Sequence, residues 1–112
     1  MAHEVELWRH RKATIGTAGT IRLDGDGIMR RHAEITVEQD GLQTGAVVLR
    51  ALEGPVSVER CGRKAVVTSD WRLADGDVII VGRRRLRYRD LGSPSVASPL
   101  ASEKKEVVSW ML

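Results

Sequence analysis

Apolar and polar residues alternate along most of the chain in short runs. The clearest run, at 33–38, places Ala33, Ile35 and Val37 on one side of an extended strand and polar residues on the other. Residues 47–49 are instead a continuous apolar run, which is typical of a strand covered on both faces. Turn sequences such as Asp-Gly-Asp-Gly at 24–27 separate the runs. The pattern predicts short strands at 4–8, 13–15, 21–23, 33–38, 47–49, 56–58, 65–67, 77–81 and 84–89.

Short strands at close spacing, with no helical period between them, are the pattern of a β-sandwich or barrel. No internal repeat occurs, and the alternation of strand and helix that builds a parallel nucleotide-binding sheet is missing. We therefore expect an all-β fold over residues 4–90.

The chain changes character after residue 90. Residues 91–101 include a stretch rich in Gly, Pro and Ser and are expected to be a linker. Residues 102–112 start with Ser102, which suits a helix N-cap, and continue with a stripe of apolar residues at helical spacing. We expect a short amphipathic helix there. A helix of this length is marginal by itself, so it must dock, either on its own domain or on a partner, including a second copy of the chain.

Composition limits the class of protein. The 112 residues suffice for one domain with a real core, and 42% hydrophobic with 29% charged residues is typical of neither a disordered nor a membrane protein. The charged N-terminus is not a secretory signal. Cys61 is the only cysteine, which excludes an internal disulfide and a cysteine-rich zinc site. We expect an intracellular protein, without separating cytoplasm, cytoskeleton and nucleus.

Three segments carry motifs that occur together in one family. Ile15-Gly16 is followed by Ile-Arg-Leu at 21–23, then by IMRRHAEI at 28–35, and finally by Cys61-Gly62 and LADGDVIIVG at 73–82. This order resembles the forkhead-associated (FHA) domain, with its Gly-Arg, Ser-Arg-x-His-Ala, Asn-Gly and L-x-x-G-D-x-I-x-[IV]-G elements. The resemblance covers roughly residues 4–90. It implies an FHA-type β-sandwich of ten or eleven strands that binds phosphothreonine peptides through loops at one end and is not an enzyme.

The resemblance also implies a set of site residues. Gly16 and His32 match the glycine and the loop-supporting histidine of the family. Thr17 stands where the family has its phosphate-binding arginine, Met29 where it has a serine, and Cys61 where it has the asparagine that holds the ligand backbone. The motif's other matching or neighbouring positions are Arg30, Arg31, Gly62 and Arg63.

A phosphate group is recognised by an arginine, a hydroxyl group and backbone N–H groups that converge on it. Losing the arginine, the serine and the asparagine together weakens binding by ~4 kcal/mol, about a thousandfold. We therefore predict an interaction module of an intracellular scaffold or signalling protein that binds a protein or peptide without depending on phosphothreonine. The alternative is a phosphothreonine reader that uses Arg30 and Arg31.

A second candidate surface is the basic run near residue 85. In a strand, alternation places Arg83, Arg85, Arg87 and Arg89 on one face. Three interpretations stay open: a solvated face that protects an edge strand, a site for an acidic protein partner, and a nucleic-acid site. Nucleic acid has the lowest weight, because the net charge is only +3 and aromatic residues for base stacking are missing nearby.

No motif indicates catalysis or a cofactor. The sequence shows no nucleophile–base set, no phosphate-binding glycine loop before a helix, and no metal-ligand spacing. Cys61 lies between two arginines, which would favour a thiolate, but it equally fits an ordinary loop cysteine. No cofactor, metal or membrane contact is expected.

Overall fold

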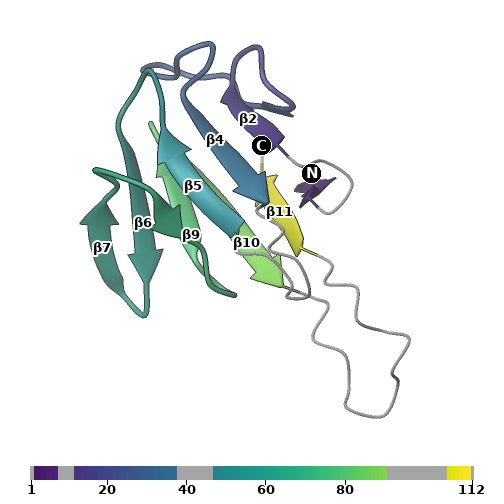
Figure 1. Cartoon of the computed structure of the whole chain (residues 1–112). Helices are drawn as coiled ribbons and strands as arrows, with labels where there is room; N and C mark the ends of the chain where they lie inside the picture. Colours follow the sequence, from purple (N-terminus) through teal and green to yellow (C-terminus); the bar gives the residue numbers. More distant parts are fainter. Residues whose placement is uncertain (1, 8–11, 38–46, 91–105, 112) are drawn as a thin grey trace.

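The structure, a computed structural model, describes residues 2–7, 12–37, 47–90 and 106–111. These residues form a β-sandwich of two sheets (Figure 1). The strands are β1 (Ala2–Glu6), β2 (Lys12–Gly16), β3 (Ile21–Arg22), β4 (Ala33–Val37), β5 (Val47–Ala51), β6 (Val56–Arg60), β7 (Arg63–Val66), β8 (Trp71–Arg72), β9 (Val78–Val81), β10 (Arg84–Asp90) and β11 (Glu106–Met111). The six-stranded sheet has the order β1-β11-β10-β9-β6-β7, and the five-stranded sheet has the order β3-β2-β4-β5-β8. The predicted all-β sandwich is confirmed.

The core lies between the two sheets and follows the predicted alternation. Leu86 on β10, Ile79 on β9 and Val58 on β6 pair in one register row, and all three are fully buried. Ile35 on β4 and Leu49 on β5 form the matching row in the other sheet. Alternate residues of each strand thus supply one continuous apolar layer.

The predicted C-terminal helix is wrong. Residues 106–111 form β11, which pairs antiparallel with β1 on one side and β10 on the other. Val108 and Trp110 are buried, and β-branched residues such as Val107 favour strands. Between β1 and β10, the backbone N–H and C=O groups of β11 can form hydrogen bonds on both sides. An isolated helix of this length is only marginally stable, so the strand is favoured. The helix expected to mediate self-association is therefore not formed by these residues. The expected linker and residues 102–105 lie outside the described residues.

The two ends of the sandwich carry different loops. The segments after β2, before β4 and between β5 and β6 meet at the upper end in Figure 1, whereas the β6–β7 turn lies at the lower end. The β9–β10 turn belongs to the upper end, because Val81 pairs with Val56, the first residue of β6. We call the upper end the loop end. Among the described residues, no helix is long and apolar enough to cross a bilayer.

Candidate functional site

The loop end is built around the buried side chain of His32. The Met29 N–H donates to Nδ1 at 3.1 Å, and Nε2 lies 2.8 Å from the carbonyl oxygen of Pro55. Because Nδ1 accepts a hydrogen bond, Nε2 carries the hydrogen and donates it to Pro55. The imidazole therefore ties the loop before β4 to the loop between β5 and β6, which is the supporting role that the resemblance implied.

Gly54 lies against this imidazole. A Cβ atom added to Gly54 would come within 2.2 Å of the His32 ring, so no larger residue fits without moving it. The Leu52 N–H donates to the His32 carbonyl at 2.9 Å, and the Glu53 N–H donates to the Arg31 carbonyl at 3.2 Å. No motif in the sequence assigns this 52–55 loop to the site. Only its Gly-Pro pair, a turn signal, pointed to it.

The loop after β2 closes the same end from the other side. The Thr17 N–H donates to the Met29 carbonyl at 3.1 Å, and the Ala18 N–H donates to the Arg30 carbonyl at 3.3 Å. The His32 N–H donates to the Ile15 carbonyl at 2.8 Å, next to Gly16. The structure therefore brings together the predicted residues Gly16, Thr17, Met29, Arg30, Arg31 and His32.

A hollow of about 350 Å³ opens between these loops. The exposed side chains of Arg30 and Arg31 line it, and within the part of the chain that the structure describes neither guanidinium has an ion-pair partner. Glu53 also lines the hollow, and its Oε1 accepts a hydrogen bond from the Arg31 N–H at 2.8 Å. The remaining lining residues are Thr14, Ala18, Gly19 and Thr20.

Glu53 changes the electrostatics of this hollow. Its carboxylate occupies a backbone N–H group that an anionic ligand could otherwise use, and it adds a negative charge beside the two arginines. The hollow therefore combines cations with an internal anion. This arrangement suits a peptide of mixed charge better than a doubly charged phosphate group.

Cys61, Gly62 and Arg63 lie at the opposite end of the sandwich. Cys61 and Gly62 form the two-residue turn between β6 and β7, where Arg60 pairs with Arg63. The five residues of β6 separate Cys61 from Pro55, so the two lie roughly 20 Å apart along the extended chain. The structure does not bring these three residues together with the hollow. The Asn-Gly pair that the family has at this position is also the commonest pair in two-residue hairpin turns, so the motif alone did not reveal where Cys61 and Gly62 lie.

The Cys61 backbone is unfavourable for a cysteine, because its φ is 52° and that of Gly62 is 78°. Positive φ at both central residues is required by type I′ hairpin turns, which prefer Asn-Gly. Cys61→Asn is expected to raise the free energy of unfolding by about 0.5–1 kcal/mol, because asparagine tolerates this region better. Denaturant unfolding under reducing conditions measures the change. Cys61→Ser is the control, since serine lacks this preference, and equal midpoints for both variants would contradict the explanation.

A buried ion pair fixes the lower end. Asp77 is 1% exposed and accepts hydrogen bonds from Arg60 Nε at 2.8 Å and Arg60 Nη2 at 2.7 Å. The Ala74 N–H donates to the same carboxylate at 2.9 Å, and the Arg60 guanidinium lies 5.2 Å from the ring centroid of Trp71. Burial would raise the pKa of Asp77, but hydrogen bonds from Arg60 and Ala74 outweigh it and lower that pKa below its ordinary value. The cluster connects β6 to β8 and β9.

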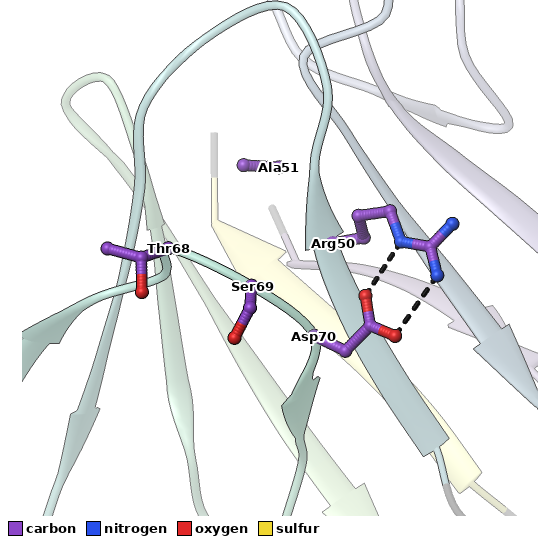
Figure 2. Close-up of a pocket in the computed structure, with 5 residues that line it drawn as sticks. All are labelled: Arg50, Ala51, Thr68, Ser69 and Asp70. Atoms are coloured by element: carbon purple, nitrogen blue, oxygen red, sulfur yellow. Dashed lines mark hydrogen bonds and ion pairs between the residues drawn. The ribbon is translucent and has the colours of Figure 1, made fainter.

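A hollow of about 470 Å³ lies between the end of β5 and the segment before β8 (Figure 2). Arg50 and Asp70 point toward each other in Figure 2 and form two hydrogen bonds, of 2.7 and 3.1 Å. The bond from Arg50 lowers the pKa of Asp70. Because the two charges neutralise each other, the hollow offers a ligand mainly the hydroxyl groups of Thr68 and Ser69.

The arginine run lies on β10 and in the turn before it. Arg85, Arg87 and Arg89 are exposed on the outer face, while Leu86 and Tyr88 are buried. β10 is an interior strand between β9 and β11, so the interpretation that these arginines protect an edge strand is wrong, although they do form a solvent-exposed face. In the described part of the chain, no group of three or more His, Cys, Asp or Glu residues could hold a metal ion.

Comparisons with known proteins agree with this architecture. No protein-family model matches the chain, and no curated protein matches it. Among solved structures, the chain is similar to the FHA domain of FhaA in the crystal structure of its complex with the intracellular domain of Rv3910. The match has a TM-score of 0.50 and 26% identity, and it covers 88% of this chain and 78% of that one. The chain therefore has an FHA-like fold, and the predicted resemblance is confirmed.

Proposed function

We propose that this domain is an interaction module of an intracellular scaffold or signalling protein and that its loop end binds a partner without requiring phosphothreonine. The FHA-like neighbour is in complex with a protein, which supports a protein ligand. The observation that carries the phosphate independence is the contact between Glu53 Oε1 and the Arg31 N–H at 2.8 Å. An internal carboxylate here competes with any phosphate group for the same donor.

Three further features of the loop end support this proposal. Thr17 and Met29 replace the arginine and the serine that the family uses for phosphate, and Met29 is 48% exposed. A charge-assisted hydrogen bond contributes about 1.5–3 kcal/mol, so losing two such groups weakens phosphate binding by a factor of at least a hundred. Met29 instead offers an apolar, adaptable contact of the kind that protein interfaces use.

The test is a peptide library synthesised with and without phosphothreonine and titrated by fluorescence anisotropy. Peptides that bind are expected to have the same affinity with and without the phosphate group. Arg30→Glu is expected to lower the affinity of both forms. Arg63→Glu reverses an exposed charge at the opposite end of the sandwich and should leave both affinities unchanged. Micromolar binding that vanishes on dephosphorylation would overturn the proposal.

The second candidate function is phosphothreonine reading through Arg30 and Arg31. It is favoured by the two guanidinium groups that line the hollow without ion pairs among the described residues. Phosphopeptide binding that Arg30→Ala abolishes would establish it in place of the first proposal.

Glu53→Gln is expected to raise the affinity for a phosphothreonine peptide about fivefold, because the neutral amide no longer repels the phosphate group. Isothermal titration calorimetry of both proteins with one phosphopeptide measures the gain. Glu59→Gln is the matched control, because it removes a carboxylate from the other sheet, far from the hollow. An unchanged affinity for the Glu53 variant would show that this carboxylate does not exclude phosphate.

A further inference from the structure

We propose that the outer face of the six-stranded sheet carries a second binding surface, a groove along β10 that takes an acidic, extended segment of a partner protein. The groove is distinct from the hollow at the loop end. Its position, its charge and the spacing of its arginines each support an acidic peptide as the occupant.

The groove exists because long and short side chains alternate across three strands. Arg87 on β10 pairs with Val78 on β9 and with Ser109 on β11, and both neighbours are short. The resulting hollow has a volume of about 540 Å³. Arg83, Arg84 and Arg85 line it together with these residues, and no acidic side chain lines it among the described residues.

The arginines of the groove are available to a ligand. Within the described chain, Arg83 and Arg87 form no ion pair. Arg85 contacts Glu59 at 3.4 Å, but its side chain is 61% exposed, and such exposed pairs contribute little and exchange readily. Arg84 is less available, because its Nε already donates a hydrogen bond to the Asp24 carbonyl at 3.1 Å. Arginine is also the side chain that best forms paired hydrogen bonds with a carboxylate.

The spacing of the arginines favours an extended peptide. Arg85 and Arg87 are two residues apart on one strand, which separates them by roughly 6.8 Å along β10. Alternate side chains of an extended ligand have the same spacing. A segment with an acidic residue at every second position can therefore place one carboxylate against each arginine.

The surroundings of the groove favour a protein over a nucleic acid. Glu59 and Glu4 flank Arg87 in its register row, on β6 and β1, so the positive surface is about one strand wide. A nucleic-acid duplex would bring phosphates over these carboxylates. The aromatic residues nearby are buried, with Trp110 at 7% and Tyr88 at 3% exposure, and cannot stack on bases.

The experiment is an NMR titration of the full chain, labelled with ¹⁵N, with a synthetic peptide of alternating Glu and Ser. Backbone amides around Val78, Arg87 and Ser109 are expected to shift, and the same peptide with Gln in place of Glu is expected to cause no shift. Raising NaCl from about 50 to 200 mM should weaken binding several-fold. Arg87→Glu is expected to reduce the affinity about tenfold or more.

Lys64→Glu is the matched control, because Lys64 is exposed on the same face but does not line the groove. It should change the affinity less than twofold, and the spectra of both variants show whether the fold is retained. The proposal is overturned if the Gln peptide binds equally, if Lys64→Glu is as harmful as Arg87→Glu, or if a DNA duplex binds more tightly at about 150 mM salt. Arg30→Glu at the loop end should leave the titration unchanged, which separates this surface from the loop-end site.

Discussion

Replacing Gly54 with alanine is expected to lower the free energy of unfolding by about 3 kcal/mol or more. The added Cβ would come within 2.2 Å of the His32 ring, and the ring cannot move without breaking its hydrogen bonds to Met29 and Pro55. Both bonds are part buried, so their loss leaves polar groups without partners. Chemical denaturation of the variant and the parent protein measures the change.

A double-mutant cycle tests the cause of that loss. His32→Ala removes the ring that Gly54 contacts, so Gly54→Ala is expected to cost less than about 1 kcal/mol in that background. Glu53→Ala, one residue away, is the control and should cost about 1 kcal/mol, because it removes only one exposed hydrogen bond. A cost for Gly54→Ala that stays the same without His32 would show that contact with the ring is not its origin.

Replacing Arg60 with alanine is expected to lower the free energy of unfolding by about 2–3 kcal/mol. Removing one partner of a buried ion pair costs about 3–5 kcal/mol, and the value is reduced here because the Arg60 side chain is 44% exposed. Asp77 would lose both hydrogen bonds from Arg60 and keep the one from Ala74. Thermal and denaturant unfolding measure the loss. Arg63→Ala removes an exposed arginine from the same hairpin and should cost less than about 0.5 kcal/mol.

The same pair predicts how stability depends on pH. The pKa of Asp77 is lower in the folded protein than in the unfolded chain. Its contribution is therefore complete above the unfolded value of about 3.9 and is lost as the pH falls through the folded value. The parent protein is expected to lose more stability than Arg60→Ala between about pH 5 and pH 3. Equal losses would show that Arg60 does not hold this carboxylate ionised.

The strands and the family resemblance could be read from the sequence, because burial between two sheets imposes a period of two on every strand. The helix prediction for residues 106–111 was wrong, because a short apolar run is compatible with both a helix and a strand. The strand conformation is decided by pairing with β10 and with β1, which lies at the other end of the chain, and no local pattern shows this pairing.

The loop-end site could be predicted only in part. The motif at 28–35 identified His32, Arg30 and Arg31, because these residues are adjacent in the chain. Glu53 and Gly54 belong to the site through contacts that cross 22 residues of sequence, and no local pattern marks them. Cys61 shows the reverse case: the resemblance grouped it with Arg30 and Arg31, whereas the fold places it in the β6–β7 turn at the far end.

By itself, the sequence determined the all-β class, the inward and outward faces of most strands, and the presence of threonine at position 17, where the family resemblance predicts an arginine. These properties depend on residue type and local spacing. The tertiary structure decided that the Glu53 carboxylate accepts a hydrogen bond from the Arg31 backbone N–H and that β11 completes the six-stranded sheet. It also decided that Arg87, on the interior strand β10, lies between the short side chains of Val78 and Ser109. Such features depend on which strands become neighbours, and this is set by packing and backbone pairing over the whole domain.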